Sequence, residues 1–256
     1  MIVSPINKGW KIIFHKAHAL LAMDIGLKLD RSLWAIPKYW AAGMESIGEH
    51  DNDQPKWNGR DNLTDSGAPL DYRQRKEVDL KQAKAVAKSA KYKSGFIVLM
   101  VSAHFHQLYG ESKELKVLKF LEEMEHKCDD IRMNLGLEKD LVSQCYSFIR
   151  FCDELSLALC QNDFENQKEP VKIKPIVGES EIYLSQLPSG EFQIEPWIFA
   201  EDKVEFNTEC FTTTTDFYSE DEELRNDLDF LHPSEKTFLF KKKDVVIKSL
   251  LVEEEH

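Results

Sequence analysis

The stretch EKDLVSQCYSFIRFCDELSLALCQ (138–161) predicts a long helix, the last of the helical part of the chain. Its second half, FIRFCDELSLALC (148–160), is strongly apolar, which is typical of a buried helix. Asp153 lies in the middle of this apolar run. Because an unpaired buried carboxylate costs several kcal/mol, we expect Asp153 to face a cation, a hydrogen-bond donor or a metal ion.

The first 166 residues are predicted to be mainly helical. Pro37 suits the first turn of a helix, and Gly136 suits the residue that follows a helix C-terminus. The segment SGFIVLMVSAHFHQLYG (94–110) is apolar enough to be buried. A long loop rich in Gly, Pro, Asn and Asp (52–73) follows the second helix, and its end, PLDYR (69–73), is a candidate lid. The expected helices cover residues 15–29, 37–50, 74–91, 113–135 and 138–161.

After residue 166 the pattern changes to short β-like segments separated by turn signals such as Pro188-Ser189-Gly190. We therefore predict an α+β fold with two parts: a helical domain over 1–166, and a small antiparallel β-rich module over 167–256 that packs on it. The residues 219–234 form a candidate short helix within the module. The expected strands cover residues 171–177, 181–187, 191–199, 203–211 and 237–243.

Composition narrows the class of protein. Of the 256 residues, 42% are hydrophobic, which is enough to build a core. The five cysteines show no paired spacing and are expected to be reduced thiols. No apolar run reaches the length of a membrane helix and no signal-peptide pattern opens the chain, so we expect a cytoplasmic protein without membrane contact.

The negative charge is concentrated in the C-terminal third. Residues 167–256 hold 10 basic and 21 acidic side chains, whereas residues 1–166 hold 23 basic and 24 acidic ones. Because like charges repel phosphates, a nucleic acid polymer is not expected as a partner of that third. The first two thirds remain open to a small anionic ligand.

Ionisable residues inside the predicted helical segments suggest a metal site. Imidazole and carboxylate ligands without a thiolate favour a divalent ion such as Mn, Fe, Mg, Zn, Ni or Co. Each ligand also has a plainer interpretation: a lone histidine is more often structural, and Asp153 could pair with Arg150 on the same helix face. His106 is expected to be structural, because it cannot face the same site as His104. The candidate metal ligands are His18, His50, Asp51, His104 and Asp153.

The order of these residues resembles the HD-domain metal-dependent phosphohydrolases. That resemblance implies a metal held by His18, the His50-Asp51 doublet and Asp153, with His104 as a ligand of a second ion. It also implies an HD-domain-like helical bundle over residues 1–166. Asp51 would act as ligand and catalytic base, and Arg150 is the leading candidate for holding a phosphate.

A second resemblance covers nearly the full chain. HALLAMDIG (18–26), GEHDND (48–53) followed by a tryptophan, CDELSLALC (152–160) and Pro196-Trp197-Ile198-Phe199 resemble a bacterial family catalogued as a domain of unknown function. Here HDNDQPKW replaces the HD-x-GW spacing of that family. The family implies the fold and the site but names no reaction.

Two functions follow from the sequence. The first is a divalent-metal-dependent hydrolase that acts on a small phosphorylated molecule, with nucleotides as one candidate class. The alternative is a non-catalytic ligand-binding or assembly domain with a structural or vestigial metal site. A homodimer is a candidate assembly, with the β-rich module as its contact.

Overall fold

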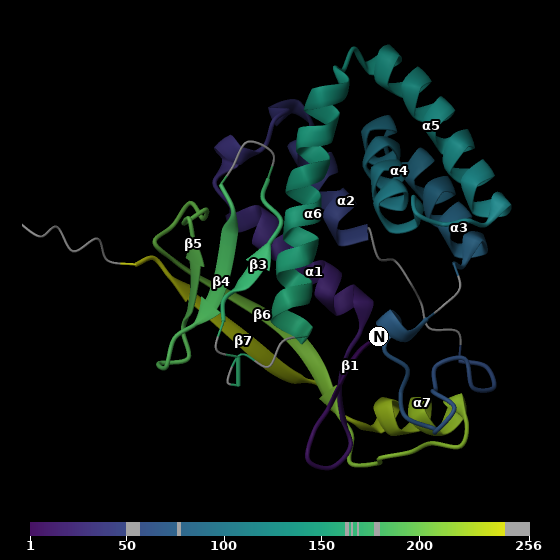
Figure 1. Cartoon of the computed structure of the whole chain (residues 1–256), viewed down its shortest axis with the longest axis vertical. Helices are drawn as coiled ribbons and strands as arrows, with labels where there is room; N and C mark the ends of the chain where they lie inside the picture. Colours follow the sequence, from purple (N-terminus) through teal and green to yellow (C-terminus); the bar gives the residue numbers. More distant parts are fainter. Residues whose placement is uncertain are drawn as a thin grey trace, which may run out of the picture.

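The computed structural model of the protein describes residues 1–49, 57–75, 78–161, 164, 166–167, 169–176 and 180–243. Within these residues a group of helices packs against one face of a curled mixed sheet (Figure 1). The expected α+β fold class is confirmed. None of the described helices is both long and apolar enough to cross a membrane.

Helix α6 is the centre of the helical layer. α1 and α2 pack against α6 and against each other, and α4 packs against α2 and α6. α3 and α5 lie on the outer side of α4 (Figure 1). The helices are α1 (His15–Lys28), α2 (Trp40–Glu49), α3 (Leu80–Lys91), α4 (Gly95–Tyr109), α5 (Leu115–Leu135), α6 (Lys139–Gln161) and α7 (Asp221–Phe230).

In the described part of the chain the sheet has seven strands in the order β1-β2-β6-β7-β5-β4-β3. All neighbouring pairs are antiparallel except β5 and β7, which are parallel, so the sheet is mixed rather than wholly antiparallel. The strands are β1 (Ile2–Pro5), β2 (Trp10–Ile13), β3 (Val171–Ile173), β4 (Ile182–Gln186), β5 (Phe192–Glu195), β6 (Lys203–Thr212) and β7 (Ser234–Lys241).

The first two strands come from the N-terminus. β1 pairs with β2, and β2 pairs with the end of β6 through Lys11 opposite Thr212 and Ile12 opposite Phe211. The sheet therefore takes residues from both sides of the predicted boundary at 166/167. The division into two domains remains a prediction.

Strand β6 shows how the sheet is packed. Its side chains alternate between exposed and buried along nearly its whole length, with Phe206 fully buried. This period of two places one face of the strand against the helices and leaves the other to solvent. In β7, Phe238 and Phe240 lie in the same core, and α1 covers β6.

Capping residues explain where the helices differ from the prediction. α3 begins at Leu80 because Asp79 accepts a hydrogen bond from the backbone N–H of Gln82 at 3.0 Å. The predicted helix begins at Gln74, which instead ends a separate 3₁₀ turn, Tyr72–Gln74. Gly136 ends α5 with φ of 64°, as expected for a left-handed cap.

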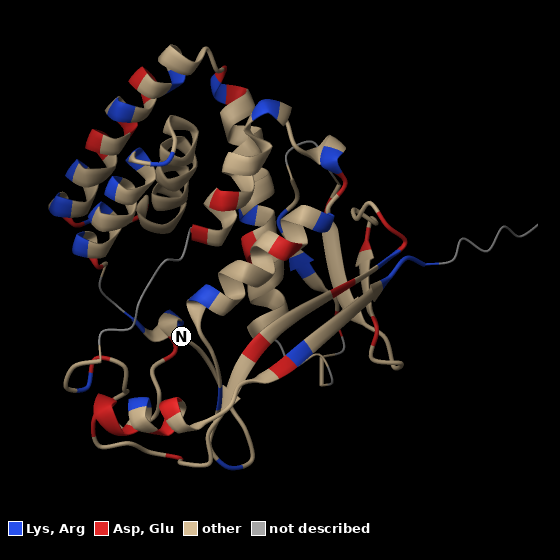
Figure 2. Cartoon of the chain, turned by 180° about the vertical axis from the view of Figure 1, so that it is seen from behind, with Lys and Arg blue, Asp and Glu red and all other residues tan. Residues whose placement is uncertain are grey.

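The charges are unevenly distributed over the surface. Acidic side chains gather on α7, α3 carries lysines and no acidic residue, and α5 carries a mixture of both charges (Figure 2). All five cysteines are free thiols, as predicted, and four of them are buried.

Candidate functional site

Helices α1 and α6 meet and bring a histidine and an aspartate together. His18 lies in the first turn of α1, and its side chain is fully buried. Its Nε2 atom lies 3.8 Å from Oδ1 of Asp153, whose side chain is 14% exposed. Two of the five predicted ligands therefore converge, and one of them remains within reach of solvent.

Ser156 determines which nitrogen of His18 faces the aspartate. The Ser156 hydroxyl donates to the backbone carbonyl of Asp153 at 2.8 Å. The Ser156 oxygen also lies 2.8 Å from Nδ1 of His18. Because the hydroxyl has one hydrogen, which it gives to the Asp153 carbonyl, Nδ1–H of His18 is the donor in this second hydrogen bond. In this arrangement Nε2 of His18 faces the Asp153 carboxylate. A ring nitrogen and a carboxylate oxygen placed in this way can share a cation or a proton.

A layer of polar aromatic side chains lies beside this pair. The His15 ring lies 6.0 Å from the His18 ring and 5.0 Å from the Tyr72 ring, both with edge-to-face geometry. The Tyr72 hydroxyl accepts a 2.6 Å hydrogen bond from Nε2 of Gln161, the last residue of α6. The 3₁₀ turn that holds Tyr72 is thereby tied to both helices of the site.

Tyr72 stays protonated at neutral pH. Its burial raises its pKa above the ordinary value, and the negative charges of Asp71 and Asp153 raise it further against the opposing effects of Gln161 and Arg73. The phenol is therefore a neutral group that can donate a hydrogen bond in the site.

Asp71 anchors the segment 69–73 and does not act as an inward-facing lid residue. Its buried carboxylate accepts hydrogen bonds from the backbone N–H of Val3 at 2.8 Å, and from the backbone N–H and Nε of Arg73 at 3.0 and 2.6 Å. Burial alone raises the pKa of Asp71, but these hydrogen bonds outweigh it, and the net pKa is lowered. The segment is thus fixed to β1, with Tyr72 held against His15.

His104 lies in a neighbouring part of the same interior. It is buried in α4, with Nδ1 3.4 Å from the Tyr146 hydroxyl of α6. Burial raises the pKa of Tyr146, and the charge of Asp153 adds to this effect, so Tyr146 lies within electrostatic range of Asp153. His106 differs, because its Nδ1 lies 2.9 Å from the Ser102 carbonyl of its own helix.

Arg150 is directed towards the β-rich part of the protein. Its Nη2 donates to the Pro175 carbonyl at 2.7 Å, and its Nε lies 3.9 Å from the Glu154 carboxylate. The Glu154 side chain also accepts from the backbone N–H of Lys174. Arg150 therefore contacts Pro175 and Glu154, and does not form the ion pair with Asp153 that the sequence allowed. A catalytic role for Arg150 remains a prediction.

The doublet His50-Asp51 lies outside the described residues, which reach Glu49 at the end of α2. The described part of α2 runs antiparallel to α1: Gly26 packs on Met44 and Ile47, and Gly48 packs near Met23. α2 therefore advances towards the end of α1 that carries His18. Among the described residues, no group of three or more His, Cys, Asp or Glu side chains is placed to hold a metal ion.

Two functional positions were not singled out by the sequence. Ser156 is one, and its only signal is the spacing of three residues from Asp153, which places both on one helix face. Asp221 is the other: it is buried at the start of α7 and accepts hydrogen bonds from the backbone N–H of Asn58 (3.1 Å) and Asn62 (3.0 Å), and from the Asn62 side chain (2.8 Å). It thereby anchors the described loop that follows the doublet.

These features define an α+β protein with a buried polar cluster between two core helices. Residues 1–214 match the family described as "Protein of unknown function (DUF3891)", and the chain belongs to that family. The matched residues include α1 to α6 and end before α7 and β7. Neither the curated proteins nor the solved structures contain a match to the chain.

Proposed function

We propose that this protein is a divalent-metal-dependent hydrolase of phosphoesters with an HD-domain-like site, and that nucleotides are a candidate class of substrate. The observation that carries the proposal is the contact between Nε2 of His18 and Oδ1 of Asp153, at 3.8 Å in the buried interface of α1 and α6. The Ser156 hydroxyl supports it, because ligand histidines commonly use their second nitrogen for such an orienting hydrogen bond.

The donor atoms suit an ion that prefers nitrogen and oxygen ligands. Burial holds the pKa of Cys152, the neighbour of Asp153, well above its ordinary value, so its thiol stays neutral and adds no thiolate. We assign His18 and Asp153 as ligands, with His50 and Asp51 as the expected ligands from the end of α2 and His104 as a ligand of a second ion. Mn, Fe, Mg, Zn, Ni and Co all fit this set.

A bound divalent ion would supply a hydroxide nucleophile at neutral pH and charge stabilisation for a phosphoryl oxygen. The residues of the chain would orient the ligands, supply charge and donate hydrogen bonds. Ser156 holds the His18 ring in one tautomer, and Asp153 supplies negative charge beside it. Tyr72, kept protonated, is a hydrogen-bond donor next to His15, and Asp51 is the expected base.

The test has two stages. The purified protein is supplemented with each of the six metals, desalted, and its metal content is measured by elemental analysis. We expect bound metal in the wild type and its loss in His18→Ala and Asp153→Ala. His126→Ala is the matched control, because His126 is an exposed histidine of α5. Circular dichroism verifies that each variant is folded.

The metal-loaded protein is then assayed with generic phosphatase and phosphodiesterase substrates. Hydrolysis that disappears in Asp51→Ala supports the proposal. Bound metal without hydrolysis of any such substrate overturns the enzymatic part and favours the alternative, a non-catalytic domain with a structural metal. Absence of metal in the folded wild type after supplementation overturns both.

A further inference from the structure

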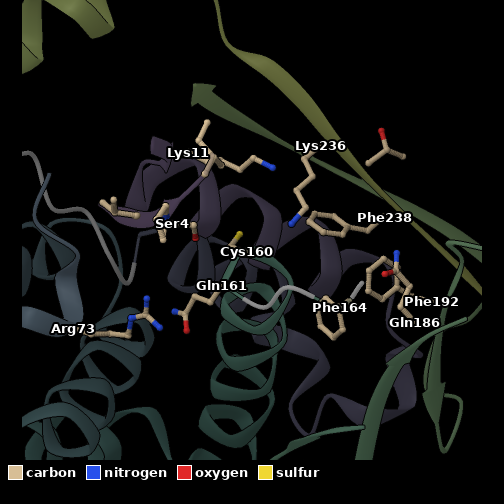
Figure 3. A pocket seen from close by; sticks show the side chains of 14 residues that line it. Ser4, Lys11, Arg73, Cys160, Gln161, Phe164, Gln186, Phe192, Lys236 and Phe238 are labelled. Atoms are coloured by element: carbon tan, nitrogen blue, oxygen red, sulfur yellow. The ribbon is translucent and has the colours of Figure 1, made fainter. Parts of the chain in front are cut away.

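A cavity of about 580 Å³ is lined in part by Gln161, the residue that binds the Tyr72 hydroxyl beside the candidate site. Its walls come from the β1–β2 hairpin, the end of α6, and strands β5 and β7 (Figure 3). The described residues that line it include three cationic side chains and no carboxylate: Lys11, Arg73 and Lys236. This is unusual in a chain with a net charge of −12.

The cationic groups approach the cavity from separate elements. The amino groups of Lys11 on β2 and Lys236 on β7 extend into the same space, and the Arg73 guanidinium faces it from the side of Gln161 (Figure 3). Asp71 binds Arg73 through Nε, which leaves the two Nη groups of the guanidinium to other partners. Lys11 has no ion-pair partner among the described residues and is partly buried.

Lys236 also offsets a partial negative charge that would otherwise repel an anion. The cavity adjoins the C-terminus of α6, where the free carbonyl groups carry partial negative charge. Nζ of Lys236 donates to one of these, the Leu159 carbonyl, at 3.0 Å. Burial raises the pKa of Cys160 to about 12, so this thiol adds no negative charge to the wall.

Another part of the cavity lining is aromatic. Phe164 and Phe192 lie edge-to-face with their centroids 5.1 Å apart, and Phe192 packs on Phe238. Nζ of Lys236 lies 4.9 Å from the centroid of the Phe238 ring. Amide and hydroxyl groups of Gln161, Gln186 and Ser4 complete the lining. The cationic side chains would bind a charged end of a ligand, and the aromatic side chains would contact a flat apolar part of the same ligand.

We infer that this cavity binds a small dianion, such as a phosphomonoester, joined to an aromatic or otherwise flat apolar group. The cations take the charged end by charge-assisted hydrogen bonds, and Phe164, which is less buried than Phe192 and Phe238 behind it, takes the flat group. The inference rests on the cavity's own residues and does not require the proposed metal site.

The experiment measures binding of phenyl phosphate, inorganic phosphate, benzoate and phenol to the full chain by ligand-observed NMR. We expect phenyl phosphate to bind most tightly, inorganic phosphate and benzoate more weakly, and phenol weakest. Binding should weaken as salt is raised, because partly exposed charges are screened. If benzoate binds as tightly as phenyl phosphate, the site is a carboxylate site, and the phosphomonoester class is wrong.

Three variants locate the site. Lys11→Gln should weaken phenyl phosphate at least about fivefold, as expected for losing a charge-assisted hydrogen bond. Lys8→Gln is the matched control, since Lys8 is an exposed lysine of the same hairpin and does not line the cavity. Phe164→Ala should weaken phenyl phosphate but leave inorganic phosphate unchanged.

The inference is overturned if folded wild-type protein binds none of the anions at low salt, or if Lys11→Gln and Lys8→Gln behave alike. His18→Ala separates it from the proposed function. This variant should lose metal but keep wild-type affinity for phenyl phosphate measured without metal. Loss of metal binding alone therefore bears on the proposed hydrolase, and loss of anion binding alone bears on the cavity.

Discussion

The hydroxyl of Ser156 lies 2.8 Å from Nδ1 of His18 and at the same time donates to the Asp153 carbonyl. One serine therefore connects the two residues that form the candidate site. It sets the tautomer of the histidine from α1 while being part of the same helical turn as the aspartate.

Ser156→Ala should reduce metal affinity about tenfold or more, because the second hydrogen bond of a ligand histidine is commonly worth that much. The fold should persist, since the change removes one hydroxyl. Ser147→Ala is the matched control: Ser147 is also buried in α6 and bonds to a carbonyl of its own helix, that of Ser143. Metal titration compares the metal affinity of the two variants. Equal affinities would show that Ser156 does not support metal binding.

Asp71→Asn should lower the free energy of unfolding by about 1–3 kcal/mol at pH 7, because it disrupts charged hydrogen bonds to Val3 and Arg73. The wild type should gain this stabilisation only where Asp71 is ionised. Its pKa is lower in the folded than in the unfolded protein, so the contribution is complete above about pH 4 and is lost as the pH falls through the folded pKa.

The measurement is the melting temperature of wild type and Asp71→Asn between neutral and acidic pH. The two curves should converge at the acidic end. Asp202→Asn is the control, because Asp202 pairs with Lys242 at an exposed position. A constant gap between wild type and Asp71→Asn at every pH would contradict the assignment of the lowered pKa to Asp71.

Asp221→Ala should destabilise the described loop around Asn58 and Asn62 by about 1–3 kcal/mol, because it removes the acceptor of the buried Asn62 N–H and of the more exposed Asn58 N–H. Hydrogen exchange should show faster exchange at these two amides. Glu222→Ala, next to it on α7 and exposed, is the control and should leave exchange unchanged. If Asn62 exchanges equally slowly in both variants, Asp221 is not the anchor of this loop.

Gly43→Ala should destabilise the protein by about 1–3 kcal/mol, because a methyl group there would lie 2.4 Å from the buried Trp34 ring. Gly48→Ala is a control in the same helix. Its methyl group would lie 3.2 Å from the flexible Met23 side chain, which can move, so the helix preference of alanine should compensate. Chemical denaturation measures the free energy of unfolding of both variants. Equal values would show that the Trp34 ring can move away from the added methyl group.

Local patterns predicted the helices well. The left-handed cap at Gly136 and the span of α6 follow from residue periodicity and capping. The pairing of β2 with β6 could not be predicted in this way, because its partners are about 200 residues apart and no local pattern encodes their register.

The contact between His18 and Asp153 agrees with the argument made from the sequence, whereas the metal site itself remains a prediction. The cost of burying Asp153 required a partner, and the structure places His18 beside it. Which face each side chain takes is set by packing between helices, so neither the orienting role of Ser156 nor the anchoring role of Asp71 could be read from spacing alone. His50 and Asp51 remain predictions.

The position of β7 has a consequence for how the protein is made. It is the last strand of the described residues, yet it lies between β6 and β5 in the sheet. During synthesis, the strands β1, β2 and β6 and the strands β3 to β5 form two separate groups until residues 234–241 emerge and join them. A stop codon placed before β7 should therefore yield a nascent protein with two open sheet edges, which chaperones would retain and proteases would remove.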